Sequence, residues 1–210
     1  MPKNVTIKDI AAEAGVSIAL VSFVMNNRIE ADGKQKYRVN KVTREKILEV
    51  ARKLNYQPNA AARTLRSGRS KVIGAILSDI SNVFYGEIAR KLEEIAFHHG
   101  YTVLFGSTDE SPEKLDRIMR SFIDKGVDGF IIVPCEGSDK SIRFIQNLGI
   151  PFVIIDRKDM AVEAPKIVLD NKGAMKSAVD ILIPKGFRKI EMLSYTMRVS
   201  SISDREDGFI

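Results

Sequence analysis

The stretch TIKDIAAEAGVSIALVSFVMNN, residues 6–27, holds two short helical patterns separated by a glycine. Its first apolar residues recur at the spacing of one helix face: Ile7, Ile10, Ala11 and Ala14. Thr6 can cap this helix, Gly15 can end it, and Ser17 can cap the next one. Two short helices joined by a tight turn are typical of a helix-turn-helix, whose second helix presents an exposed face.

The second helix of this pair is apolar on nearly all sides. Helical spacing gathers on one face the residues expected to be buried, Val21, Val24 and Met25. The opposite face, expected to be exposed, carries Ala19, Ser22, Phe23 and Asn26. Ile18 and Leu20 lie at the borders between the two faces. The sequence therefore predicts an exposed surface with few groups that can form hydrogen bonds.

A third helical pattern follows in VNKVTREKILEVARKLNY, residues 39–56, with Asn40 as its candidate cap. We expect its buried stripe to consist of Val42, Ile47, Val50, Ala51 and Leu54. Beyond Pro58, Asn59 can cap a short helix rich in alanine and arginine that ends at Gly68. This short helix is either a linker or a segment that orders only when DNA or a partner is bound.

Charge is divided unevenly along the chain. Residues 1–71 carry 15 Lys and Arg against 6 Asp and Glu, whereas residues 72–210 carry 18 against 21. A basic head on a mildly acidic body favours a polyanion as the partner of the head. A polar loop at residues 28–38 adds Lys34, Lys36 and Arg38, which either contact phosphates or belong to a solvated insertion.

From Lys71 onward, short apolar runs alternate with helical patterns. The runs that we expect to be buried strands are VIGAIL (72–77), TVLFG (102–106), GFIIVP (129–134), PFVIID (151–156) and KIVLD (166–170). Strands that alternate with helices predict an α/β body with a parallel sheet and helices on both faces. A second lobe is expected from residue 170, with residues 171–187 as its first helix and KIEMLS (189–194) as its first strand. We expect that lobe to be incomplete at Ile210, because of either a fragment or a truncated gene.

Polar and aromatic residues follow these strands at the edge where parallel sheets bind ligands. Asp79, Asn82, Phe84 and Tyr85 follow the first strand. Ser107 and Thr108 follow the second strand, and Asp156 and Arg157 follow the fourth. Each of the two aspartates either faces a cleft or caps a helix.

Composition and motifs exclude several classes of function. With one cysteine, Cys135, and only His98 and His99, the chain offers neither a disulfide framework nor metal-ligand spacing, and we expect no cofactor. There is no P-loop, no G-x-G-x-x-G after a strand and no G-x-S-x-G, so we expect no enzyme. No run approaches the roughly 18 apolar residues of a spanning helix, and a signal-peptide core is missing, which predicts a cytoplasmic protein.

Several ordered blocks resemble the lactose/galactose repressor (LacI/GalR) family of transcriptional regulators. They include TIKDIAAEAGVS (6–17), VTREKILEVARKLNYQPN (42–59), AARTLRSGRS (61–70), VDGFIIVP (127–134), GIPFVIIDR (149–157) and DREDGF (204–209). The resemblance implies an all-α helix-turn-helix head and a periplasmic-binding-protein-like α/β sensor domain. The implied parts are the head at 1–57, a hinge helix and linker at 58–70, a first lobe at 71–169 and part of a second lobe at 170–210.

The resemblance also implies which residues meet DNA: Thr6, Ser17, Ile18, Ala19, Leu20, Ser22, Phe23, Asn26, Asn59, Ala62, Arg63 and Leu65. Residues 18, 19 and 23 face base edges, whereas residues 6, 20 and 22 lie near phosphates. Leu65 wedges into the minor groove, packs against its dimer mate, or does both. Leu20 and Phe23 depart from the family, which commonly has threonine and a polar or basic residue there. We therefore expect contacts to thymine methyl groups and an operator half-site rich in A·T.

In the body, the implied effector site comprises Asp79, Asn82, Phe84, Tyr85, Asp156, Arg157 and Arg205, the last at the place of a family arginine that holds the effector. The resemblance implies a homodimeric regulator, either a repressor, which we expect, or an activator, that binds a pseudo-palindromic double-stranded operator. Its effector lies between the lobes; a carbohydrate or a derivative is expected, and purines and phosphosugars fit the same fold. Such a repressor is cytoplasmic and associates with the nucleoid when it binds DNA. The alternative is a small-molecule receptor or sugar-acting enzyme with the same body, whose basic head is an interaction module.

Overall fold

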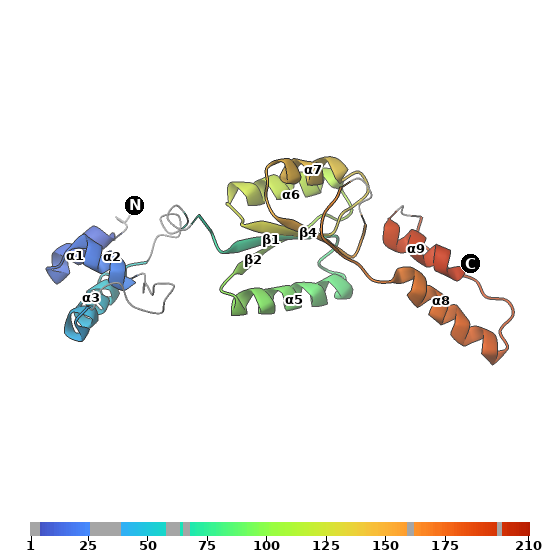
Figure 1. Ribbon diagram of the computed structural model, residues 1–210, viewed down its shortest axis with the longest axis horizontal. Coiled ribbons are helices and arrows are strands. Elements are labelled where there is room, and N and C mark those ends of the chain that lie inside the picture. Colours follow the sequence, from blue (N-terminus) through green and yellow to red (C-terminus); the bar gives the residue numbers. More distant parts are fainter. Residues whose placement is uncertain (1–4, 26–38, 58–63, 65–67, 159–161, 197–198) are drawn as a thin grey trace. The chain divides into compact units, whose positions relative to one another are not determined.

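The computed structural model describes residues 5–25, 39–57, 64, 68–158, 162–196 and 199–210. Its contacts divide the chain into two compact units, Met1–Arg66 and Ser67–Ile210, which are treated separately below (Figure 1). The predictions for the loop at 28–38 and for most of the hinge lie outside the described residues. The same holds for five predicted DNA-binding residues, Asn26, Asn59, Ala62, Arg63 and Leu65.

The first unit contains a helix-turn-helix, as predicted. The helices of its described part are α1 (Ile7–Ala14), α2 (Ile18–Met25) and α3 (Lys41–Lys53). At the start of α1, the Asp9 carboxylate accepts hydrogen bonds from the backbone N–H and the hydroxyl of Thr6, at 2.8 and 2.7 Å. Gly15 ends α1 at φ +64°, a conformation that glycine adopts without a steric penalty. The Ser17 hydroxyl then accepts the Leu20 N–H at 3.2 Å and caps α2.

In the third helix, the predicted cap Asn40 is confirmed, but the predicted burial of Val42 is not. The Asn40 side chain accepts the N–H of Val42 at 3.0 Å, as expected of a cap. Val42 itself is 70% exposed, so its assignment to the buried stripe was wrong. At 3.6 residues per turn it lies about 140° around the helix from Ile47, on the other side. The core of the unit is made of Ile10, Ala11, Ala14, Val21, Val24, Ile47 and Ala51.

The second unit is built on a parallel sheet, which confirms the predicted α/β body. Its strands are β1 (Val72–Leu77), β2 (Thr102–Ser107), β3 (Gly129–Ile132), β4 (Phe152–Ile155) and β5 (Lys166–Ile167). They run parallel in the order β2-β1-β3-β4-β5. Helix α5 (Val83–His98) covers one face, and α6 (Pro112–Asp124) and α7 (Asp139–Asn147) cover the other (Figure 1). From β1 the chain continues to β2 on one side and then crosses back to β3 on the other side of β1. Sheets of this kind bind ligands at this switch point, between β1 and β3.

The main core of this unit lies between the sheet and helices α6 and α7. It consists of Ile76, Leu115, Met119, Phe122, Val127, Phe130, Ile132, Cys135 and Ile145. Gly74 permits this packing, because a Cβ there would lie 2.7 Å from a ring carbon of Phe122 and 2.9 Å from Phe130. Burial, with the Glu110 carboxylate nearby, raises the pKa of the Cys135 thiol to about 11. The thiol is therefore protonated at neutral pH, which suits a packed residue.

The last part of the chain forms a helical hairpin. Helix α8 (Asn171–Leu182) continues into the 3₁₀ turn η1 (Ile183–Lys185) and packs against α9 (Ser200–Phe209), as Figure 1 shows. The predicted strand at residues 189–194 was wrong: these residues pair with no strand, and Leu193 is fully exposed. A strand needs a neighbouring strand for its backbone N–H and C=O groups, and the described residues offer none there.

Candidate functional site

The first turn of α2 is the candidate DNA-binding surface of the first unit. Ser17, Ile18 and Ala19 are exposed there, with Ile18 at 45%. Leu20 and Ser22 are half-buried. The amino end of a helix carries the positive pole of its dipole and unpaired N–H groups, both of which suit a phosphate. Three of the predicted DNA-binding residues are thus accessible at the amino end of α2.

Phe23 differs from its predicted position. Its side chain is only 8% exposed, so the prediction that it lies on the exposed face of α2 was wrong. Burying a phenylalanine side chain stabilises a fold by about 1.5–3 kcal/mol, which favours covering the ring over leaving it in water. In this structure Phe23 therefore presents little surface to a base edge.

The second unit has a hollow of about 870 Å³ at the carboxyl ends of β1, β2 and β4, beside α9. It is lined by Ser78, Asp79, Ser81, Asn82, Phe84, Tyr85, Asp109, Glu110, Asp156, Arg157, Tyr195, Val199, Ser201, Ile202 and Arg205. All seven residues that the sequence analysis assigned to an effector line this hollow. The structure thus brings together side chains from the loops after β1, β2 and β4, from the start of α5, from α9 and from the segment before α9.

The loop after β1 supplies one wall of the hollow. Asp79 Oδ1 accepts hydrogen bonds from the N–H and the hydroxyl of Ser81, at 2.8 and 2.7 Å. These bonds lower the pKa of Asp79, which is therefore ionised at neutral pH. The cap of α5 is Asn82, whose side chain accepts the N–H of Phe84 at 3.0 Å. Asp79 is accordingly held by a local turn, and its carboxylate borders the hollow.

Asp156 is positioned by strained backbone and by a tyrosine. It adopts φ +67°, a conformation that aspartate tolerates better than most residues. Its side chain is 8% exposed, and Oδ2 accepts the hydroxyl of Tyr85 at 2.8 Å. Burial raises the pKa of Tyr85 well above its ordinary value, so the hydroxyl remains a donor. No described residue donates a hydrogen bond to Oδ1 of Asp156, which leaves that oxygen for another donor.

Arg157 forms a nearly buried ion pair with Glu110. Its two amino groups donate to the two carboxylate oxygens of Glu110 at 2.6 and 2.7 Å, and Nη1 also donates to the carbonyl of Pro134 at 3.1 Å. The hydroxyl of Ser78 donates to the same carboxylate. Burial alone would raise the pKa of Glu110, but the bonds from Arg157 and Ser78 lower it. The guanidinium Nε is buried without a hydrogen bond, 3.6 Å from Asp156 Oδ2.

Glu110 was missed by the sequence analysis. It lies three residues beyond the end of β2 and has φ +62°, which no periodic pattern reveals. Its role depends on Arg157, which is 47 residues away in the chain. The prediction that Arg157 contacts an effector remains a prediction, since its described partners are all groups of the protein.

Helix α9 is tied to the sheet edge and to α8. Ser200 Oγ accepts the N–H of Lys158 at 2.6 Å, and the ammonium of Lys158 pairs with Asp204 at 2.6 Å. Arg205 donates from Nε to Oδ1 of the buried Asn171 at 2.9 Å. These contacts place Arg205 in the lining of the hollow, across from the loops of the sheet.

Two family models match this chain. Residues 6–59 match "Bacterial regulatory proteins, lacI family". Residues 70–210 match "Periplasmic binding proteins and sugar binding domain of LacI family". The chain belongs to the LacI family.

Relatives and solved structures of this family resemble the chain along most of its length. Catabolite control protein A of Priestia megaterium is 34% identical over 194 residues, which are 92% of this chain and 56% of that protein. The ribose operon repressor of Halalkalibacterium halodurans is 35% identical over 204 residues, 97% of this chain and 58% of that protein. The chain thus spans a little over half the length of these curated relatives.

Solved structures of this family share the fold of the chain, and one of them is bound to DNA. The lac repressor dimer bound to operator and the anti-inducer ONPF superimposes with a TM-score of 0.82 at 24% identity. The match covers 98% of this chain and 60% of that one. At this identity the likeness establishes the fold of the LacI-family chain and does not identify its ligands.

The described ranges contain neither a metal-binding cluster nor a membrane-spanning helix. No cluster of three or more His, Cys, Asp or Glu residues that could bind a metal ion occurs there. None of the helices in that part of the chain has the length and apolar character needed to cross a membrane.

Proposed function

We propose that this LacI-family chain is part of a sequence-specific transcriptional regulator, a repressor that binds operator DNA under the control of a small-molecule effector. One observation carries the proposal: a helix-turn-helix with an accessible α2 is followed in the same chain by a sheet with a polar hollow of about 870 Å³. A module for DNA and a module for a small ligand in one chain are the parts that such a regulator requires. The location we infer is the cytoplasm, with association to the nucleoid when DNA is bound.

The proposed effector is a carbohydrate or a derivative of one. Asp79 and Asp156 offer carboxylate oxygens that accept bonds from hydroxyl groups, and Arg205 offers a guanidinium donor. Phe84, which is 42% exposed, gives the hollow an aromatic face against which the C–H side of a sugar ring can pack. Hydroxyl-binding carboxylates beside an aromatic ring support a polyhydroxylated ligand.

The proposed mechanism couples the two modules through two states of the protein. A homodimer presents two heads to a pseudo-palindromic operator, and the effector binds one of the two states more tightly than the other. By linkage, an effector that lowers the affinity for operator is itself bound less tightly when the operator is present. Residues 58–70 connect the modules and are the proposed hinge.

The first prediction concerns affinity for DNA and its dependence on salt. A mobility-shift titration with DNA fragments enriched from random sequence is expected to show specific binding at least about a thousandfold tighter than binding to unrelated DNA. The logarithm of the affinity should fall steeply with the logarithm of the salt concentration, because the basic head releases counterions from phosphates. Binding that is weak and indifferent to sequence would refute the proposal.

The second prediction concerns the composition of the operator. Ile18 and Ala19 are exposed at the start of α2 and can pack against thymine methyl groups, whereas Phe23 is covered. Sites selected from random DNA are therefore expected to have a half-site rich in A·T. Ile18→Ala should relax the preference at one base pair by about 1–3 kcal/mol, with little change at the others. A half-site dominated by guanine would show that α2 recognises DNA differently.

A further inference from the structure

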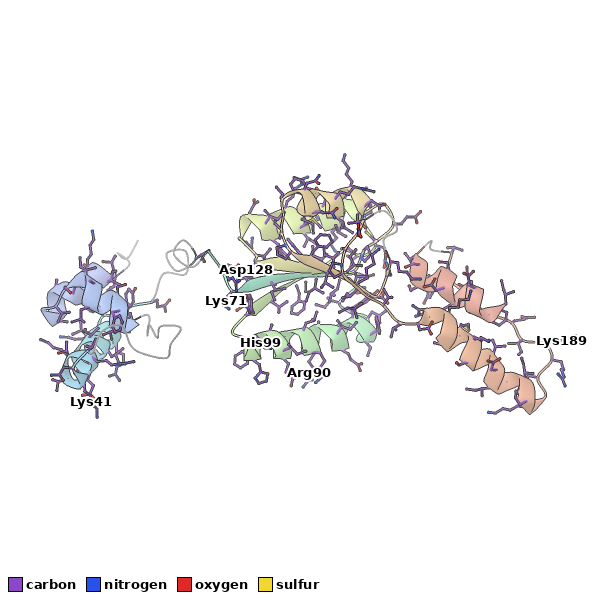
Figure 2. All side chains as sticks on the ribbon, viewed as in Figure 1. Lys41, Lys71, Arg90, His99, Asp128 and Lys189 are labelled. Atoms are coloured by element: carbon purple, nitrogen blue, oxygen red, sulfur yellow. The ribbon has the colours of Figure 1, made fainter. Side chains whose placement is uncertain are left out.

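The point at which the chain enters the sheet is held by one carboxylate. Asp128, in the loop between α6 and β3, accepts the N–H and the hydroxyl of Ser70 on Oδ1, at 2.7 and 2.9 Å. Its Oδ2 accepts the N–H of Lys71 at 3.0 Å. Figure 2 labels Asp128 and Lys71 at the same end of the sheet, before β1 begins. Both carboxylate oxygens thus accept hydrogen bonds from the two residues that precede β1.

The backbone at this point is strained and held from several sides. Lys71 adopts φ +61°, which is unfavourable for a residue with a Cβ and persists only where its surroundings impose it. Its carbonyl accepts the N–H of Thr102 at 2.9 Å, and its ammonium lies 4.3 Å from the centre of the Tyr101 ring. The conformation of Lys71 is therefore fixed by β2 as well as by Asp128.

Asp128 is ionised under ordinary conditions. Burial pushes its pKa upward, but the hydrogen bonds from Ser70 and Lys71 outweigh burial and lower the pKa below its usual value. Bonds from N–H groups to a charged acceptor are stronger than those between neutral groups. The ionised carboxylate can therefore hold the chain firmly at neutral pH. A flexible linker between two modules needs no fixed end, so this anchor calls for another role.

We propose that Asp128 is a positioning residue for DNA binding, which fixes the point at which the linker leaves the sensor domain. This inference rests on the proposed function. With Ser70 and Lys71 held, the segment that connects the modules has a fixed length, and each head is presented to its half-site from a defined position. Without the carboxylate, Ser70 loses this partner and Lys71 keeps only its contacts to Thr102 and Tyr101, so the connection gains freedom and the effective concentration of the second head at its half-site falls.

The test compares Asp128→Ala and Asp128→Asn with a matched control, Asp124→Ala. Asp124 is an exposed carboxylate at the end of α6, four residues before Asp128. Operator affinity is expected to fall about three- to tenfold in Asp128→Ala, to fall less in Asp128→Asn, which keeps one acceptor, and to stay unchanged in the control. The salt dependence of binding should remain that of the unmodified protein, since no phosphate contact is removed.

Limited trypsin digestion supplies a readout that does not involve DNA. Cleavage after Arg69 and Lys71 is expected to be faster in Asp128→Ala than in the control. Asp128 accepts the N–H of the Arg69–Ser70 bond directly, and it fixes the Ser70 hydroxyl that accepts the N–H of the Lys71–Val72 bond. Circular dichroism checks that the second unit still unfolds cooperatively. If unfolding is less cooperative in Asp128→Ala, the operator affinity and the cleavage rate of Asp128→Asn decide whether Asp128 has the positioning role.

The possible outcomes separate the inference from the proposed function. If the unmodified protein binds operator and both Asp128 variants bind equally well, the positioning role is wrong and the proposed function stands. A smaller salt dependence in the variants would also overturn it, since the loss would then come from phosphate contacts. If the unmodified protein recognises no DNA sequence, both fail. Weaker binding with unchanged salt dependence and faster cleavage would support the positioning role.

Discussion

Glu110→Gln is expected to lower the free energy of unfolding of the second unit by about 3 kcal/mol at pH 7, the lower end of the cost of breaking a buried ion pair. The substitution keeps the shape of the side chain but removes its charge. The guanidinium of Arg157, whose side chain is 10% exposed, would keep the carbonyl of Pro134, the amide of the new glutamine and the Asp156 carboxylate, 3.6 Å from Nε, but would lose the carboxylate that binds both of its amino groups. Losing the carboxylate partner is costly because the guanidinium side chain is only 10% exposed and little water can replace that partner.

Urea unfolding followed by circular dichroism measures this loss, with Glu113→Gln as the matched control. Glu113 is an exposed carboxylate at the start of α6, so its substitution should change the stability by less than about 0.5 kcal/mol. The double variant Glu110→Gln/Arg157→Met removes both charges and should recover part of the loss. Equal stability of the Glu110 and Glu113 variants would show that the ion pair contributes nothing.

The effect should depend on pH in a defined direction. The pKa of Glu110 is lowered from its ordinary value of 4.5, so the pair contributes its full stability above that value. The contribution is lost as the pH falls through the lower pKa of the folded protein. The difference between the unmodified protein and Glu110→Gln should therefore narrow in acid and stay constant between neutral pH and the ordinary pKa of glutamate.

The location of the hollow was predictable from sequence because it depends on the order of elements. Alternating strands and helices force a parallel sheet, and its ligands bind at the carboxyl ends of the strands. Asp79 and Asp156 each directly follow a strand or lie two residues beyond one, so strand boundaries alone place them at this edge. The helix caps Asn40 and Ser17 were predictable for a similar reason, since capping is a local property.

Features that depend on contacts distant in sequence were not predictable. Arg157 was a candidate because it follows a strand, but nothing in the sequence indicates that it pairs with Glu110. Phe23 is apolar on a face that the helical pattern leaves outward, and only the folded chain shows that it is covered. The expected strand at residues 189–194 failed because an apolar run becomes a strand only beside a partner. Val42 is a different error, since its angle on α3 already separates it from Ile47.

Ile47→Ala is expected to unfold much of the first unit and to weaken operator binding at least tenfold. Ile47 is fully buried and lies in one cluster with Ile10 and Val21. Truncating a buried isoleucine to alanine costs about 2–5 kcal/mol. A unit of this size has a total stability of only about 3–10 kcal/mol at 0.05–0.15 kcal/mol per residue, so the loss is a large share of the total. In the proposed dimer each operator binds two folded heads, so partial unfolding of the heads lowers the affinity twice.

Val42→Ala on the same helix is the matched control, because Val42 is 70% exposed and should tolerate truncation within about 0.5 kcal/mol. Thermal unfolding by circular dichroism should show the transition of the first unit shifted down in Ile47→Ala only. The second unit has its own core, so its transition should be the same in both variants. If Val42→Ala destabilised the first unit as much as Ile47→Ala, Val42 would be buried against α1 and α2, as the sequence analysis expected. Weakened DNA binding without a shifted transition would instead assign Ile47 a direct part in the interface, which its complete burial argues against.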